Sequence, residues 1–120
     1  MAEHRDDVMD VEDIMEQVRR QQEELERVER DVRGMEVRGH SRDHEVTATM
    51  RGDGRFTDIA IDPDTVRRHD PEEIGAIVLE AVNNAMDRLA EATTASYAPL
   101  IEAATRAADL PDWPLEAPRP

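Results

Sequence analysis

The N-terminal third of the chain carries a hydrophobic pattern with a period of seven residues. Apolar side chains recur at the first and fourth positions of successive heptads from residue 11 to residue 35, with one polar interruption at Gln21. This seam predicts an amphipathic helix over residues 6–34 that packs against another helix as in a coiled coil. Gln21 has two interpretations, a residue that sets the register between two chains and a tolerated polar position at an edge.

Between residues 36 and 62 the hydrophobic period changes to two, which predicts three strands, around 35–40, 45–51 and 55–62. The turn sequence GDG decides the register of the last two strands. With Asp53 and Gly54 as the central turn residues, apolar side chains face each other across the hairpin. The pairs are then Val46 with Ile61, Ala48 with Ile59, and Met50 with Thr57. We therefore expect an antiparallel sheet with one apolar face and Gly54 in a left-handed conformation.

The C-terminal half begins with a strong helix signal. Asp70 is the expected N-cap, Pro71 the first helical residue, and Glu73 the partner in a capping box. An apolar stripe of period 3.6 then predicts a helix over residues 71–98. Pro99 is expected to break or kink this helix before a short helix at 100–109. Residues 111–120 are a proline-rich tail. It has two interpretations, a segment that docks onto the domain through Trp113 and a disordered tail.

Together these elements predict a single α+β domain over residues 1–110, in the order helix, three antiparallel strands, helix (α-β-β-β-α). The chain has only one Phe, one Tyr and one Trp, so we expect a small core. A partner chain is therefore expected, with dimer contacts through the sheet and the helices. The candidate core and dimer residues are Val46, Ala48, Met50, Ile59, Ile61, Ile74, Val78 and Val82.

Charge narrows the possible partners. The chain has 29 acidic and 15 basic residues, a net charge of -14, which repels polyanions and anionic membranes at long range. All the basic residues are arginines, and several on the first helix follow a glutamate by four residues: Glu16–Arg20, Glu23–Arg27, Glu26–Arg30 and Glu29–Arg33. Such pairs favour a solvated helix face over a phosphate-binding stripe. The absence of a signal peptide pattern or a long apolar run predicts a soluble, cytoplasmic protein.

Only the strand region is close to neutral, with six acidic residues and six arginines between positions 37 and 69. If DNA is bound, these arginines are the candidates for phosphate contacts, because they lie outside the paired helix faces. They are Arg38, Arg42, Arg51, Arg55, Arg67 and Arg68. Arg51 and Arg55 flank the hairpin turn, which makes the hairpin the best place to look for a phosphate contact. For each residue, a solvated loop or an ordinary hairpin flank is the competing interpretation.

Other chemistries find little support in the sequence. His40 and His44 have a weak metal-site spacing and no third ligand nearby in sequence, so exposed loop histidines are the preferred interpretation. The RGD tripeptide at 51–53 is explained by the turn. There is no cysteine, nucleophile elbow or phosphate loop. We therefore expect no enzyme activity, no cofactor and no metal.

The segments VTATMRGDGRFTDIAIDPDTV and DPEEIGAIVLEAVNNAMDRLAE, in this order after a long helix, resemble the YbaB/EbfC family of nucleoid-associated proteins. The shared features are a strand of the form V-x-x-T-M, a Gly-x-Gly turn, a strand that ends in I-D-P, and a helix that contains AVNNAMDRLAE. Within this helix the residues that fit the form typical of the family are Val82, Asn84, Ala85 and Met86. The resemblance covers residues 11–98. It implies a homodimer with a joint core of strands and projecting helices, which binds DNA in the nucleoid with little sequence preference.

The charge of -14 departs from what this resemblance implies. It favours a second hypothesis, an acidic protein-interaction module or adaptor on the same fold that does not bind DNA, for example beside a secretion system. Low-salt DNA binding and recovery of a protein partner discriminate between the two. The resemblance ranks DNA binding first; composition alone would rank it second.

Overall fold

A computed structural model describes residues 10–108 of the chain, and for residues 107 and 108 the backbone alone. The elements are helix α2 (Val11–Gly34), strands β1 (Glu36–His40), β2 (Val46–Arg51) and β3 (Phe56–Ile61), and helices α3 (Pro63–Arg68) and α4 (Pro71–Ala108). The described residues divide into two compact units, of which the first ends at Asp31 and the second begins at Val32. The predicted order of helix, three antiparallel strands and long helix is confirmed. The proline-rich tail and Trp113 lie outside the described residues.

Helix α2 ends at Gly34, as the heptad pattern predicts, and carries Glu12 and Asp13 in its first turn. Its seam is largely exposed to solvent in the single chain, with Val11 and Ile14 at 72% and 46% exposure. The side-chain pairs on its surface differ from those predicted. Within the described part of the helix the ion pairs are Arg19–Glu16, Arg27–Glu24 and Arg27–Asp31. Spacings of three and four residues are both close on a helix, so rotamers choose between them.

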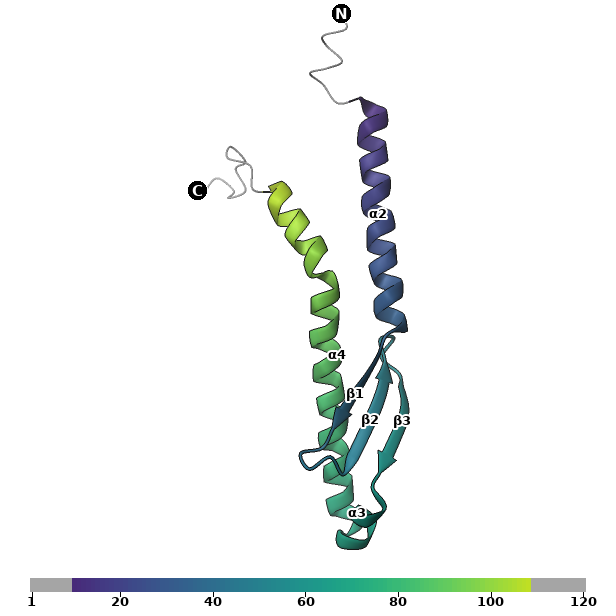
Figure 1. Ribbon diagram of the computed structural model, residues 1–120, viewed down its shortest axis with the longest axis vertical. Helices are drawn as coiled ribbons and strands as arrows, with labels where there is room; N and C mark the ends of the chain where they lie inside the picture. Colours follow the sequence, from purple (N-terminus) through teal and green to yellow (C-terminus); the bar gives the residue numbers. More distant parts are fainter. Residues whose placement is uncertain (1–9, 109–120) are drawn as a thin grey trace, which may run out of the picture. The chain divides into compact units, whose positions relative to one another are not determined.

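The three strands form one antiparallel sheet in the order β1-β2-β3 (Figure 1). The predicted pairs Val46–Ile61 and Ala48–Ile59 are confirmed. The predicted pair Met50–Thr57 is wrong, because an irregularity between Thr49 and Met50 places Met50 opposite Phe56 instead. Thr57 is therefore an extra residue on β3 and forms a β-bulge, in which two residues of one strand lie opposite one residue of the other.

The hairpin turn explains the shift. The Gly54 N–H donates to the Arg51 carbonyl at 2.9 Å, and the Arg51 N–H donates to the Arg55 carbonyl at 2.8 Å. Gly52 and Asp53 are therefore the central turn residues, one position earlier than predicted. Gly54 follows in the left-handed region with φ of 92°, as predicted. A three-residue loop of this kind starts the ladder one residue out of the predicted register, and the bulge restores it.

Helix α4 begins with the predicted reciprocal cap. The Glu73 N–H donates to Asp70 Oδ1 at 2.8 Å, and the Asp70 N–H donates to Glu73 Oε1 at 2.9 Å. Of the two outcomes predicted at Pro99, a break before a separate short helix is wrong, since α4 continues through Pro99 to Ala108. Proline only removes one backbone donor and crowds the preceding turn, so a helix can pass through it with a bend. Figure 1 shows that α4 bends toward its C-terminal end.

Helix α3 was not predicted, and it is set by local capping. The Asp62 side chain accepts from the Asp64 N–H at 2.9 Å, and Pro63 is the first helical residue. The Thr65 side chain of this helix is fully buried, and its hydroxyl has no hydrogen-bond partner among the described residues.

Replacing Thr65 with valine should stabilise the protein. The substitution keeps the shape of the side chain and removes a buried hydroxyl that lacks a partner, which ordinarily costs about 1 to 3 kcal/mol. We expect the free energy of unfolding to rise by about 1 kcal/mol in urea titrations. Thr65→Ser, which retains the hydroxyl and removes a methyl group, is the control and should destabilise. A destabilised Thr65→Val protein would show that the hydroxyl has a partner in solution.

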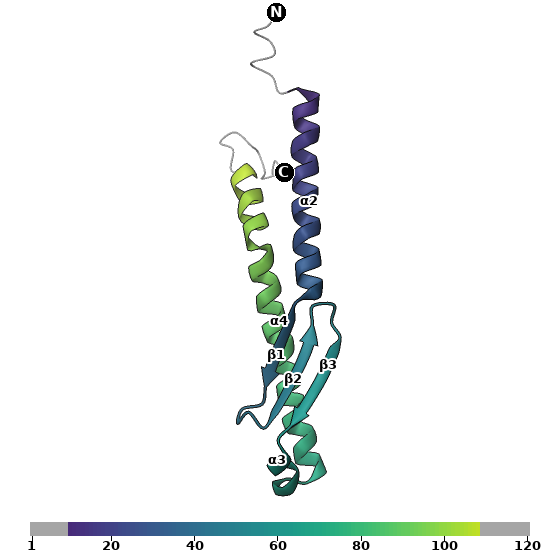
Figure 2. The ribbon, with the colours of Figure 1, turned by 45° about the vertical axis from the view of Figure 1, so that its right-hand side comes forward.

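The core lies between α4 and the sheet, and small residues dominate it. Its buried members are Val46, Ala48, Met50, Ala81 and Ala85. Helix α4 packs against β1 and β2, and both ribbon views show the sheet along the first half of this helix (Figures 1 and 2). The close approach depends on Gly39 of β1, where an added Cβ would lie 2.1 Å from the Ala85 nitrogen.

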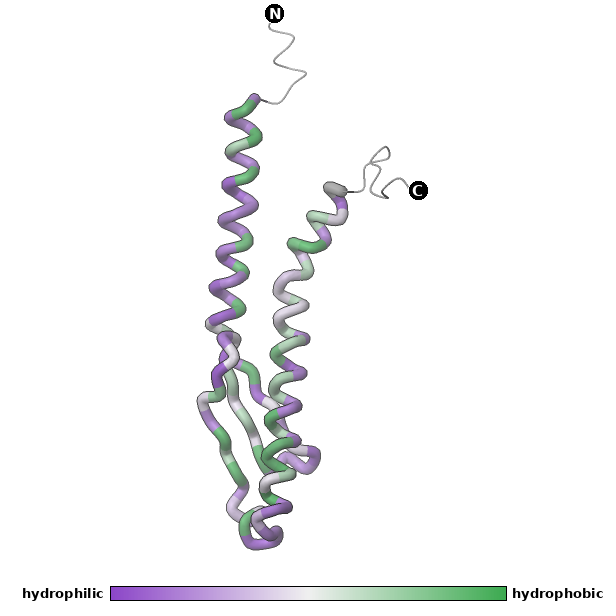
Figure 3. The backbone as a smooth tube through the Cα atoms, turned by 180° about the vertical axis from the view of Figure 1, so that it is seen from behind, coloured by the Kyte–Doolittle hydropathy of each residue, from purple (hydrophilic) through white to green (hydrophobic). Residues whose placement is uncertain are grey.

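The eight candidate core residues divide accordingly. Val46, Ala48 and Met50 are buried, and Val78 and Val82 are partly buried against the core. Ile74 is half-buried and lies outside this cluster. The prediction of a buried face that includes Ile59 and Ile61 is wrong for the single chain, where they are 39% and 38% exposed. They lie on β3, which α4 leaves largely uncovered. Figure 3 shows hydrophobic positions on both the strands and α4.

Candidate nucleic-acid interface

The sheet has a second face, opposite α4, which carries most of its polar side chains. Side chains alternate between the faces of a strand, so the residues between Val46, Ala48 and Met50 belong to this second face. The register gives two polar rows across it, Glu36 opposite Arg51, and Arg38 opposite Thr49 with Asp58 beyond. This face is the open side of the sheet.

Arg51 and Arg55 lie at one end of the sheet, on either side of the hairpin turn. The turn is held by the backbone hydrogen bonds of Arg51 with Arg55 and with Gly54, and by the Arg55 N–H, which donates to Asp53 Oδ1 at 3.0 Å. Both arginines are exposed. Among the described residues, no carboxylate forms an ion pair with either guanidinium. The turn therefore presents two positive charges without an ion-pair partner among the described residues, on a hydrogen-bonded backbone.

Three of the other candidate arginines are already paired. Arg42 binds Glu80 of α4 with its backbone N–H and its guanidinium, the latter at 2.9 Å. These contacts, the backbone hydrogen bond first, lower the pKa of the Glu80 carboxyl. Arg67 pairs with Asp64 at 2.7 Å and Arg68 with Glu45 at 2.6 Å. A carboxylate partner reduces the positive potential that a phosphate meets, so these three are the weaker candidates.

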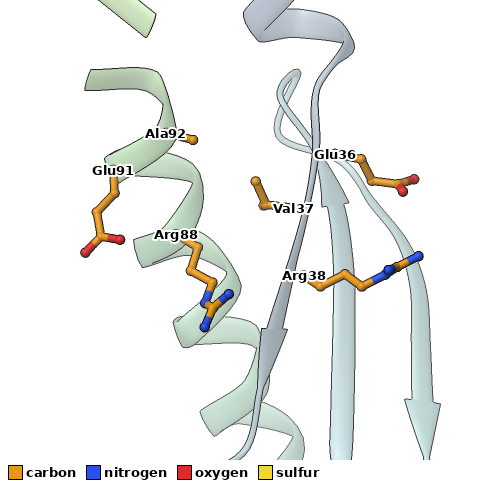
Figure 4. Close-up of a pocket in the computed structure, with 6 residues that line it drawn as sticks. All are labelled: Glu36, Val37, Arg38, Arg88, Glu91 and Ala92. Atoms are coloured by element: carbon orange, nitrogen blue, oxygen red, sulfur yellow. The ribbon is translucent and has the colours of Figure 1, made fainter. Parts of the chain in front are cut away.

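Arg38 lies on β1, where the structure adds a residue that the sequence analysis does not select. Arg38 and Arg88 of α4 line the same open depression of about 660 Å³, together with Glu36, Val37, Glu91 and Ala92. Figure 4 shows Arg88 between α4 and β1, while Arg38 extends across the sheet and Glu91 points away from β1. The sequence does not mark Arg88 because it stands alone among the acidic residues of α4, whose other arginine, Arg106, lies in the last turn. The position of Arg88 four residues after Asn84 is the signal that would have marked it.

His40, at the end of β1, is tied to α4 and surrounded by basic groups. Its backbone N–H donates to Asn84 Oδ1 at 2.8 Å, and its Nδ1 lies 3.0 Å from Thr47 Oγ1. Its ring lies 4.7 Å from that of His44, centroid to centroid. Burial first, and then His44, Arg88 and Arg38, lower the pKa of His40. The described residues hold no cluster of three or more metal-ligating side chains.

The arrangement is that of a small α+β protein with an open sheet face and unpaired arginines at its edges. No helix in the described part of the chain is both long and apolar enough to cross a membrane. Comparison with known proteins identifies the class: residues 8–104 match the model of the YbaB/EbfC DNA-binding family. The chain belongs to this family.

Individual relatives agree with this assignment. The nucleoid-associated protein LBA0378 of Lactobacillus acidophilus is 33% identical over 73% of this chain and 79% of its own length. A nucleoid-associated protein of Corynebacterium kroppenstedtii is 34% identical over 63% of this chain and 76% of its own length. The uncharacterized protein HP0035 of Helicobacter pylori shares the fold, with a TM-score of 0.60 and 17% identity over 78% of this chain and 99% of its own. The protein is thus a DNA-binding protein of this family.

Proposed function

We propose that this protein is a homodimer of the cytoplasm and nucleoid that binds the DNA backbone with little sequence preference, and that unpaired arginines at the edges of the sheet make the contacts. The observation that carries the proposal is the division of the arginines into paired and unpaired sets. Arg51 and Arg55 of the turn, and Arg38 and Arg88 at the β1 edge, have no carboxylate partner among the described residues. Phosphate contacts of this kind do not read sequence.

Net charge opposes the approach of DNA but does not prevent contact. A dimer carries twice -14, or -28, which repels DNA at long range. At about 0.1 M salt the repulsion between exposed charges is largely screened beyond roughly 10 Å. At contact distance the local charge matters most, and the strand region from 37 to 69 carries as many arginines as carboxylates.

The homodimer is supported by apolar surface that the single chain leaves exposed. Three large side chains of β3, Phe56, Ile59 and Ile61, are each close to 40% exposed, and β3 is an edge strand. Ile59 and Ile61 lie beside the buried Ala48 and Val46 in the sheet register, so the uncovered surface continues the core. A second copy that covers it would enlarge a core made mostly of small residues.

A salt titration of DNA affinity tests the proposal. Each phosphate contact releases counterions, and its loss lowers the slope of log affinity against log salt by about 0.9. We expect the Arg51→Gln/Arg55→Gln variant to weaken binding on all sequences and to lower the slope by about two units per protomer. The matched control is Arg27→Gln/Arg67→Gln, which removes two arginines that are already paired. Its net charge equals that of the Arg51→Gln/Arg55→Gln variant. Equal losses in both variants would contradict the assignment of the turn arginines.

The acidic charge also supports a second candidate function, that of a protein-interaction module without a DNA role. Absence of DNA binding at low salt and tens of micromolar protein would favour this candidate over the first. Pull-down from the native host would then be expected to recover a protein partner, whereas recovery of nucleic acid alone would count against it.

A further inference from the structure

A group of basic side chains gathers where β1 meets α4, away from the hairpin turn. It consists of Arg38 and His40 on β1, His44 in the following loop, and Arg88 on α4; we call these four residues the β1 basic strip. Two observations place them together: Arg38 and Arg88 line one depression, and the His40 and His44 rings are 4.7 Å apart. Such a concentration is unexpected in a chain with a net charge of -14.

The backbone holds this strip in place independently of its side chains. Asn84 Oδ1 accepts from the His40 N–H at 2.8 Å, so β1 is fixed to α4 at this point. Arg88 lies one helical turn after Asn84 and therefore on the same face of α4. His44 has a φ of 60°, and its N–H donates to the Ser41 carbonyl at 2.9 Å, so the loop folds back toward the end of β1. The side chains can thus be changed without removing these backbone contacts.

The charges around His40 favour an anion. The charged groups that act on it come from the loop, α4 and β1, and they are His44, Arg88 and Arg38; Thr47 of β2, its hydrogen-bonding neighbour, is uncharged. Two carboxylates, Glu36 and Glu91, line the nearby depression. In Figure 4 Glu91 points away from β1, and Glu36 points away from α4, as Arg38 does. Among the described residues neither forms an ion pair with Arg38 or Arg88.

We infer that the β1 basic strip is a phosphate-binding surface for the DNA backbone, and that protonation of His40 strengthens the binding of DNA. The inference rests on the proposed DNA-binding function and adds to it a second contact surface with a pH dependence. In the free protein burial, and then the neighbouring positive charges, disfavour the imidazolium form of His40. A bound phosphate offsets the repulsion from these charges, so His40 takes up a proton on binding. Linkage then requires affinity to rise as the pH falls through the pKa of His40.

Fluorescence anisotropy of a labelled DNA duplex, at about pH 6 and about pH 8 and constant ionic strength, tests the inference. A rise of about one pKa unit on binding, for one histidine, gives up to a tenfold gain in affinity. We expect the wild-type protein to bind about threefold to fivefold more tightly at the lower pH, below the tenfold limit because the pKa of His40 in the free protein is lowered. His40→Gln/His44→Gln should match the wild type at the higher pH and lose the gain. Arg38→Gln/Arg88→Gln should weaken binding at both values and lower the salt slope.

Arg51→Gln/Arg55→Gln is the control, since it should weaken binding but keep the pH-dependent gain. Circular dichroism at both pH values shows whether each variant is folded, and His40→Gln alone replaces the double variant if that does not fold. Unchanged pH dependence in the folded histidine variant would overturn the strip while leaving DNA binding intact. A wild-type protein that binds no DNA at either pH would overturn the proposed function, and the strip with it.

Discussion

Replacement of Gly39 with alanine should destabilise the protein by about 3 kcal/mol, near the upper end of the usual cost of overpacking. A Cβ at this position would lie 2.1 Å from the Ala85 nitrogen, 2.5 Å from its Cα and 2.6 Å from the Ala81 carbonyl oxygen. These are backbone atoms, so no rotamer change can make room. Helix α4 would have to move away from β1, and the buried contacts of Ala81 and Ala85 with the sheet would loosen.

Thermal and urea unfolding at equal protein concentration measure this effect, since the stability of an oligomer depends on concentration. For a domain of this size, about 3 kcal/mol corresponds to a fall in Tm of roughly 12 to 24 °C. Gly75→Ala is the matched control. Gly75 lies in α4 with no atom within 4 Å of the added Cβ, so alanine should stabilise the helix by about 0.5 to 1 kcal/mol. A Gly39→Ala protein as stable as wild type would contradict the close packing of β1 on α4.

Replacement of Ile59 with aspartate should convert the proposed dimer into monomers. Burial of an isoleucine stabilises by about 1.5 to 3 kcal/mol, and a symmetric interface contains two copies. The variant dimer loses this stabilisation in both protomers and would have to bury two unpaired carboxylates. We therefore expect the dissociation constant of the dimer to rise at least about 100-fold, as measured by sedimentation equilibrium. The fold should survive, because Ile59 is 39% exposed in the single chain.

Ala60→Asp provides the control for this experiment. Ala60 is the next residue of the same strand, is exposed, and lies opposite Thr47 on the other face of the sheet. The Ala60→Asp substitution introduces the same charge into β3 but leaves the apolar surface unchanged, so the dimer should persist. Dissociation of both variants to the same extent would point to a general effect of charge on the edge strand. A wild-type protein that is monomeric at micromolar concentration would contradict the dimer itself.

The sequence by itself determined the features that depend on neighbours within a few residues. The change from a helical period to a period of two located the strands. Asp70 and Glu73 set the cap of α4 because both partners of a capping box lie in one turn. The apolar alternation predicted the pairing of Ala48 with Ile59, since a slip by one residue would move every side chain to the other face, whereas the glycine pattern placed the turn one position too late.

The tertiary structure alone decided which candidate residues are available. Arg42 and Arg68 look like Arg51 and Arg55 in the sequence, but Glu80 and Glu45, 38 and 23 residues away, pair with them. Likewise, Arg88 joins the candidate surface only because Asn84 fixes β1 to α4. Ile59 and Ile61 have the pattern of core residues, but they are exposed because α4 packs against β1 and β2. Local periodicity assigns a residue to a face of the sheet, whereas the placement of distant elements determines whether that face is covered or a charge is paired.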